Sequence, residues 1–305
     1  SSTVLQSGEA VTFETYAADS VLSANGPITS RSTAAASEPL VPISFATTTH
    51  VTPTNRGSEE FFVLSPFSDA DVEVFVGGSL TPAASSTVLA GDATSYAVGI
   101  GGGDSGIVEA SEPVLLYHSE PGDRDVAYPR TTRDLYGIRS NSYNYASVND
   151  GGEVAVFCSD GTTGTTSAMT RGSEESNDFC GTGGQGTGNA MRLTNISEPI
   201  GAVQEADGDG GESSRFLPTP EFGTRYVVPQ SADYVSIVCA PRFGSTTIEI
   251  RTSLGSVIDS DSCNPSGDFP GALNFTPTSP YPAGTQIVSP DGTPFYMYYE
   301  AQPSE

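Results

Sequence analysis

The sequence predicts an all-β protein, built as a tandem array of small antiparallel β-sandwich units of the Ig-like or jelly-roll-like kind. The 305 residues include 34 Gly and 22 Pro but no Trp. Short β-branched and aromatic runs alternate with Gly, Pro, Asn and Asp, which is typical of sandwiches. Long runs of helix-forming residues are missing, and two series of proline-marked segments recur along the chain.

Four segments share the pattern of a turn, a proline and an apolar run, and they define the repeat. Their prolines are Pro27, Pro113, Pro199 and Pro294, at intervals of 86, 86 and 95 residues. A second series, "LVPIS", "AYPRT" and "FLPTP", recurs with nearly the same period. Two independent series with one period predict about three and a half repeats of 86–95 residues.

The two series divide the chain into a partial unit and three whole ones. Residues 3–30 align with residues 87–119, with residues 18–21 opposite 103–106, so the chain opens in the C-terminal half of a unit. Such a half unit exposes strand edges, and we expect an upstream part of the polypeptide, the next unit or another subunit to cover it. The predicted boundaries are a partial β unit at 1–41 and β-sandwich units at 42–128, 129–217 and 218–305.

Each whole unit contains two apolar runs separated by turn residues, at 59–78, 143–161 and 232–255. The Asn-Asp-Gly-Gly between the two runs of 143–161 predicts a β-hairpin. Alternation along 232–239 places Val235, Ile237 and Cys239 on one face of a strand. In each unit we then expect a Gly-, Ser- and Thr-rich excursion, a polar strand and a strand that begins at the repeated proline.

The four cysteines fall as two pairs, Cys158 with Cys180 and Cys239 with Cys263, each inside one predicted unit. Pairing within units would close two long Gly- and Ser-rich loops and stabilise the fold by about 3 kcal/mol each. Other connectivities and four buried free thiols are the alternatives. Disulfides indicate residence or assembly outside a reducing cytosol.

The formal net charge of −25 excludes direct binding to nucleic acid or to anionic membranes, because these partners require clustered cations. All 12 basic residues are Arg. The sequence has no run of 18 apolar residues, so no segment is predicted to insert into a membrane. The chain begins without Met and without the apolar region of a signal peptide, so we expect either a processed start or a part of a longer polypeptide.

Few residues suggest chemistry. Gly-Asp-Ser-Gly at 103–106 follows His50, as in trypsin-like proteases, but we interpret it as a hairpin turn because its counterpart at 18–21 lies in a similar connection. We expect His50 and His118 in loops or at sheet edges, without a metal. Asp207 and Asp209 are candidate calcium ligands in a glycine-rich loop that is otherwise a solvated turn. We expect no catalytic residues and no other cofactor.

Four stretches resemble known families: "SEPVLLYHSEPGDRDVAYPRTTRDLYGIRSN", "NDGGEVAVFCSDGTTGTT", "SEPIGAVQEADGDGGESSRFLP" and "EFGTRYVVPQSADYVSIVC". They are similar to repeated β modules of marine bacteriophage virion structural proteins. More loosely, they resemble the IgGFc-binding-type repeats of secreted bacterial surface proteins. The resemblance covers about residues 40–300 and implies display on a virion or cell exterior in a structural or adhesive role.

The sequence therefore predicts a non-enzymatic structural component of an extracellular assembly, either a virion fibre or surface protein or a secreted filament. We expect units that stack end to end through proline-led strands and through joints such as Asp123, Arg124 and Asp125, with copies of itself or neighbouring subunits as partners. A surface adhesin or glycan-binding module that uses tyrosine and aspartate loops on a host-surface glycan is the alternative. An exported hydrolase is the third reading.

Overall fold

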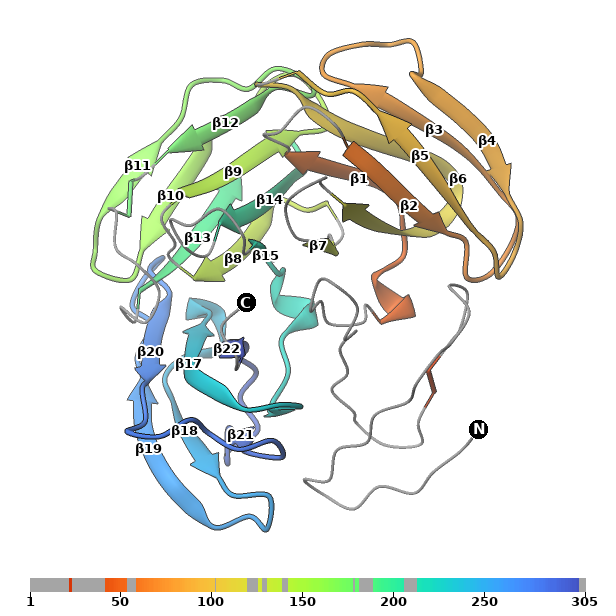
Figure 1. Cartoon of the computed structure of the whole chain (residues 1–305). Helices are drawn as coiled ribbons and strands as arrows, with labels where there is room; N and C mark the ends of the chain where they lie inside the picture. The colour runs from red at the N-terminus through yellow and green to blue at the C-terminus, as the bar shows by residue number, and fades with distance from the viewer. Residues whose placement is uncertain are drawn as a thin grey trace.

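The computed structural model describes residues 22–23, 42–53, 59–101, 103–119, 126–127, 131–138, 142–177, 179–180, 189–205 and 213–301. Within these ranges the protein is all-β: every helix is a short 3-10 turn, and all pairs of named strands are antiparallel. The described strands follow an arc from β1 to β22 (Figure 1). No helix in these ranges has the length and apolar character needed to cross a membrane.

The first strand group, residues 47–127, is organised around the long strand β6. The first half of β6 pairs with β1 and β3, and its second half pairs with β2 and β7. One strand thus belongs to a front sheet, β4-β3-β6-β1, and to a back sheet, β5-β2-β6-β7. The elements are η1 (Ile43–Phe45), β1 (Thr47–Pro53), β2 (Glu59–Leu64), β3 (Ala70–Val76), β4 (Ala84–Val88), β5 (Ala93–Val98), β6 (Ser105–Ser119) and β7 (Val126–Ala127).

The second strand group, residues 134–215, has two separate sheets. Its front sheet has the order β11-β10-β13-β8, and its back sheet the order β12-β9-β14-β15. The strands are β8 (Asp134–Ile138), β9 (Ser142–Ser147), β10 (Val154–Cys158), β11 (Thr163–Thr165), β12 (Glu174–Asn177), β13 (Ala190–Asn195), β14 (Ile200–Glu205) and β15 (Ser213–Arg215).

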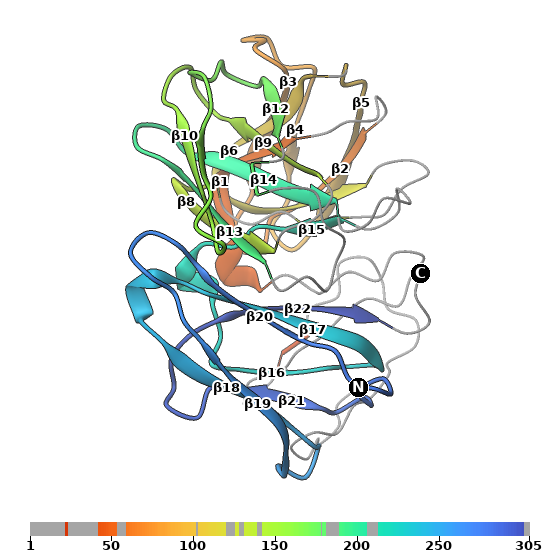
Figure 2. The same ribbon diagram turned by 90° about the vertical axis from the view of Figure 1, so that its left-hand side faces the viewer.

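The third strand group, residues 225–301, has the front sheet β19-β18-β21-β16 and the back sheet β20-β17-β22. Figure 2 shows the back sheet nearer to the second group and the front sheet farther away. The elements are η2 (Thr219–Glu221), β16 (Arg225–Val227), β17 (Ala232–Cys239), η3 (Pro241–Phe243), β18 (Thr246–Arg251), β19 (Val257–Cys263), β20 (Gly271–Phe275), β21 (Gln286–Val288) and β22 (Tyr296–Ala301).

The pairing order is the same in all three groups. The front sheet always joins the first, third, fourth and sixth strand segments, and the back sheet always joins the second, fifth and seventh. The repeated prolines mark the start of the seventh segment: β14 begins directly after Pro199, and β22 begins shortly after Pro294. Pro113 instead lies inside β6, beside a bulge in the β1 pairing, where its missing N–H removes no ladder hydrogen bond.

Each group buries one apolar cluster between its front and back sheets. The alternation predicted for β17 is correct, because Val235, Ile237 and Cys239 all point into the cluster of the third group. Burying such side chains stabilises a fold by about 1.5–3 kcal/mol each. The main members are Phe61, Val63, Val72, Val74, Val108 and Leu116 in the first group, Leu135, Tyr143, Tyr145, Val156 and Leu193 in the second, and Val235, Ile237, Ile248, Ile250 and Phe295 in the third.

The predicted hairpins are wrong. The two apolar runs of each unit form strands that lie in opposite sheets, so the turn between them connects the back sheet to the front sheet. The strand pairs are β2 and β3, β9 and β10, and β17 and β18. In the Asn-Asp-Gly-Gly connection, the Asp150 carboxylate accepts a hydrogen bond from the distant Arg171 N–H at 2.8 Å. Turn residues of this kind suit a crossover as well as a hairpin, because both need positive φ and side-chain caps.

Two disulfides join the cysteine pairs that the sequence suggested, Cys158 to Cys180 and Cys239 to Cys263. The Cα atoms are 5.3 and 6.3 Å apart. All four sulfur atoms are buried in the clusters of the second and third groups. The pairs indicate an oxidising environment for the folded protein.

Replacing Cys158 and Cys180 together with Ala should lower the free energy of unfolding by about 3 kcal/mol, since the bond closes a loop with a sequence separation of 22. Urea denaturation of the wild-type and double-variant chains measures this difference. Treating the double variant with a thiol reductant should lower the midpoint further, because the second disulfide remains. An unchanged urea midpoint would contradict the prediction.

Candidate functional site

The protease-like constellation does not assemble. Ser105 begins β6, and β1 pairs with it so that His50 lies opposite Val108, about 10 Å along the strand from Ser105. The Ser105 hydroxyl is fully buried and donates to the carbonyl oxygen of Gly172 at 2.9 Å. His50 is equally buried, and its Nε2 donates to the carbonyl oxygen of Val114 at 2.9 Å. The hydroxyl is thus not activated by the imidazole.

Gly-Asp-Ser-Gly is part of a joint between strand groups. The N–H of Glu174 donates to the carbonyl oxygen of Gly103, Asp104 forms an antiparallel bridge with Ser173, and the N–H of Ser105 donates to the carbonyl oxygen of Gly172. The predicted turn is confirmed only at Gly103, which has a φ of +88°; Asp104 lies in the bridge, and Ser105 and Gly106 begin β6. It is not a hairpin turn, because β5 and the first half of β6 lie in different sheets.

Both histidines lie in strands rather than in loops. His50 is on β1, the edge strand of the first front sheet, so a sheet edge was correctly predicted for it, whereas His118 lies on β6 between β2 and β7, so the prediction is wrong for His118. His50 belongs to β1, and its hydrogen bond to the Val114 carbonyl spans the bulge where β6 passes from the front to the back sheet. His118 belongs to β6, is 1% exposed and packs against Phe61 with the rings tilted and their centroids 5.1 Å apart. Each imidazole fills a core position rather than serving a solvent-facing function.

At the first joint, the front sheet of the first group packs its outer face on the back sheet of the second group. A separate apolar cluster spans this contact, with Val51, Phe75 and Ile107 on one side and Ala146 and Val148 on the other. The backbones approach closely here: a Cβ added to Gly201 on β14 would lie far inside contact distance of the Val51 carbonyl oxygen. Glycine is needed at such an approach.

Arg171 holds the first joint. Its guanidinium donates to the Val148 carbonyl at 2.7 Å and to the Glu109 carboxylate on β6 at 3.1 Å, and it lies 5.2 Å from the centre of the Phe75 ring. The side chain is only 13% exposed, whereas that of Glu109 is 41% exposed. The planar guanidinium therefore makes an ion pair and a cation–π contact to the first group, while a hydrogen bond to the Val148 carbonyl holds it within its own group.

At the second joint, the front sheet of the second group packs on the back sheet of the third. The ring of Phe222, beside η2, lies 5.5 Å from that of Tyr136 and 6.1 Å from that of Tyr296. Burial, followed by the neighbouring Asp134 carboxylate, raises the pKa of Tyr136 well above its ordinary value, so its hydroxyl stays protonated. The buried members of the cluster are Phe45, Tyr136, Ile138, Ala190, Leu217, Phe222, Val238, Ala240 and Tyr296.

Arg192 holds the second joint. It pairs with Asp134 at 2.7 Å in its own sheet and with Asp268 of the third group at 3.0 Å. It also lies over the rings of Tyr136 and Phe157. Burial lowers the pKa of Arg192, but the hydrogen bond to Asp134 and the surrounding negative charges outweigh it and raise the pKa. The charge at this joint is therefore permanent. The predicted joint residues Asp123, Arg124 and Asp125 lie outside the described residues.

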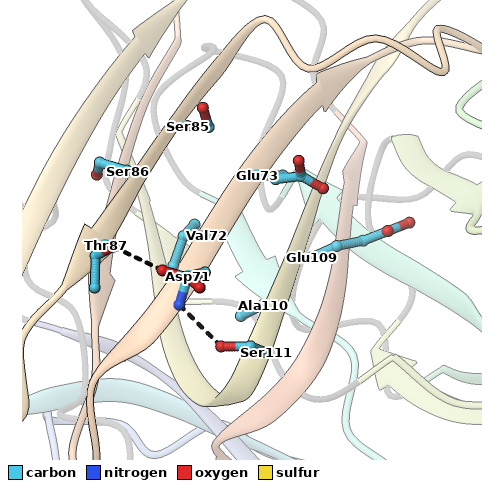
Figure 3. A pocket seen from close by; sticks show the side chains of 9 residues that line it. All are labelled: Asp71, Val72, Glu73, Ser85, Ser86, Thr87, Glu109, Ala110 and Ser111. Atoms are coloured by element: carbon cyan, nitrogen blue, oxygen red, sulfur yellow. Dashed lines mark hydrogen bonds between the residues drawn. The ribbon is translucent and has the colours of Figure 1, made fainter.

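A hollow of about 540 Å³ opens on the first front sheet, over β3, β4 and β6 (Figure 3). Glu73 and Glu109 stand opposite one another on paired strands, and the Asp71 carboxylate accepts a hydrogen bond from the Thr87 hydroxyl at 2.6 Å. Glu109 also binds Arg171, which neutralises one carboxylate of the pair. The lining residues are Asp71, Val72, Glu73, Ser85, Ser86, Thr87, Glu109, Ala110 and Ser111, without an aromatic side chain to stack on a sugar.

The remaining candidate ligands divide between buried and undescribed residues. Tyr143 and Tyr145, in the apolar run that opens 143–161, are 2% and 1% exposed in the second cluster, so their rings do not face solvent where a sugar could stack. Asp207 and Asp209 lie outside the described residues. Among the residues that are described, no three His, Cys, Asp or Glu side chains gather to hold a metal ion.

A comparison with models of protein families and with curated proteins found no match to this chain. The joints are the feature that sequence reasoning missed. Their arginines follow no periodic pattern, and the only available signal was that every basic residue is Arg.

Replacing Arg171 with Met should lower the free energy of unfolding by about 2–3 kcal/mol, because it removes hydrogen bonds to a carboxylate and a carbonyl in a half-buried joint. Hydrogen exchange should rise at residues 103–110 and 146–150. The control Arg133→Met removes an exposed arginine and should cost less than about 0.5 kcal/mol. Equal losses in both variants would contradict a special role for Arg171.

Replacing Gly172 with Ala should destabilise the protein by about 2 kcal/mol or more. Its φ is +66°, and an added Cβ would lie well under 3.0 Å from the Gly77 carbonyl oxygen of the first group. Gly244→Ala is the matched control, because Gly244 has a φ of +76° but no atom within 4 Å of the added Cβ. The control should cost about 1 kcal/mol, and urea midpoints that are equal would show that the joint tolerates the methyl group.

Proposed function

We propose that this protein is a non-enzymatic structural component of an extracellular assembly, either a virion fibre or surface protein or a secreted filament. It is a tandem array of small antiparallel β-sandwich units that associates with copies of itself or neighbouring subunits through strand edges. The three strand groups fall within the predicted units at 42–128, 129–217 and 218–305, whereas the predicted partial unit at 1–41 lies almost wholly outside the described residues.

The observation that carries the proposal is the repeated joint. In both joints the front sheet of one group packs face to face on the back sheet of the next, with an apolar cluster and a partly buried arginine. A contact that recurs in the same sense between successive units is heterologous, and such contacts build linear arrays. This geometry replaces the end-to-end stacking expected from the sequence.

Three further observations support an exposed and chemically inert role. The disulfides require an oxidising environment during or after assembly. The net charge of −25 keeps neighbouring particles apart at low ionic strength. The buried Ser105 and His50 side chains serve the fold, which leaves the joints as the feature best suited to a task.

Electron microscopy of the native source material, labelled with antibodies raised against the purified chain, tests the proposal. Gold label on the exterior of filaments or virions is expected. The control serum should be depleted with the same purified chain, which should abolish the label. Label confined to the interior of intact cells would show that the protein is not an exterior component.

A further inference from the structure

The back sheet of the first group has a face that corresponds to the two faces buried in the joints. Equivalent positions on the three faces are identified by their distance from the repeated proline and by the cross-strand register of the back sheets. Tyr117, Val203 and Tyr298 each follow their proline by the same number of residues. Their cross-strand partners are Phe62, Asn144 and Ser236 respectively. These three partners therefore occupy one equivalent position on the outer faces of three back sheets.

Burial at this equivalent position differs sharply. Asn144 is 9% exposed and Ser236 is 2% exposed, because each lies under the front sheet of the preceding group. Phe62 is 38% exposed, although it is the largest and most apolar of the three. Leu64, two residues along β2, is half-buried, whereas its equivalents Ala146 and Val238 are fully buried. Leu115, opposite Leu64 on this face, packs against the cluster of the second joint, so the face is partly covered. Phe62 marks the part of the first back sheet that has the apolar character of a joint face without equal cover.

The direction of the joints indicates what covers this face. In both joints the cover is the front sheet that lies immediately before it in the chain. For the first back sheet, the preceding chain is residues 1–41. Residues 3–30 align with residues 87–119, which contain the last two residues of β4, the whole of β5 and the whole of β6. The joint-forming strand that they match is therefore the first half of β6, which belongs to a front sheet. In that alignment Leu22 lies opposite Ile107, a member of the first joint, and Leu22 is 43% exposed.

The other end of the array does not match this face. The front sheet of the third group carries the ion pair of Arg251 with Glu249 and the amide of Gln286 along its outer face. The equivalent faces in the joints carry Phe75 and Ile107. Because an ion pair loses its hydration against an apolar face, a second copy docked head to tail is disfavoured there.

We propose that residues 1–41 of this chain dock on the outer face of the first back sheet, with Leu22 against the face that Phe62 marks, and so form a third joint of the same kind. The proposal rests on the repeated unit in the proposed function and names the partner of one of its faces.

Cysteine cross-linking in the full chain tests the placement. The four native cysteines are paired, so Leu22→Cys combined with Phe62→Cys adds the only two thiols. A short bifunctional maleimide should link them within one chain, as seen by peptide mass spectrometry of the monomer band. The control combines Leu22→Cys with Thr247→Cys, on an exposed part of the third front sheet, and should give at least tenfold less link.

A second variant guards against effects of the new thiols. Phe62→Arg should raise hydrogen exchange of residues 1–41 at least tenfold, while exchange in β10 stays unchanged. Phe67→Arg is the control, because Phe67 is 58% exposed in the turn before β3, and it should leave residues 1–41 unaffected.

Two results would overturn the proposal. A link between positions 22 and 62 found only in dimers would assign the face to a second copy, and cross-linking at the control level together with unchanged exchange in Phe62→Arg would show that the segment does not dock there. Neither result bears on where antibodies label the native material, so a failure of this inference is distinguishable from a failure of the proposed function.

Discussion

The structure depends on a simple constraint: the outer faces of its internal sheets are apolar and must be covered. A two-sheet sandwich normally buries its inner faces and wets its outer ones. Here Phe75 and Ile107 point away from their own cluster and are buried only because the next group lies against them. Val238, on β17, does the same at the second joint. The groups are therefore held as neighbours by the faces that a solitary sandwich would leave polar.

The arginines add specificity to these apolar contacts. Arg171 and Arg192 each contact a carboxylate across the joint and an aromatic ring, in a chain whose other charges are mostly negative. A lysine could supply the charge but not the planar fork that meets a carboxylate and a ring together. This difference is one physical reason why arginine suits the two joints. All 12 basic residues of the chain are Arg.

Composition and alternation were sufficient for the strands and the faces of β17, because these depend on local pattern, and the spacing of the cysteines within units suggested the two disulfides. Pairing was harder. The Asn-Asp-Gly-Gly run carries a hairpin signal, yet β9 and β10 lie in opposite sheets, while the Asp160-Gly161 turn between β10 and β11 makes the real hairpin. Turn residues report backbone conformation and not the partner strand. The joints were invisible for a similar reason: periodicity shows that both faces of a strand are apolar, but not what covers the outer one.

The sharing of β6 between two sheets has a mechanical consequence. Its 15 residues pass from one layer of the first group to the other without a break. Tension along this strand would reach both layers at once and would load its flanking ladders in shear, where many bonds must rupture together. In the second and third groups the same passage is made through short turns at Pro199 and Pro294. The third group joins its layers by a different route, because the disulfide from Cys239 on β17 to Cys263 on β19 links its back sheet to its front sheet. The first group thus transmits a pull between its layers through one continuous backbone, and the third through a covalent cross-link.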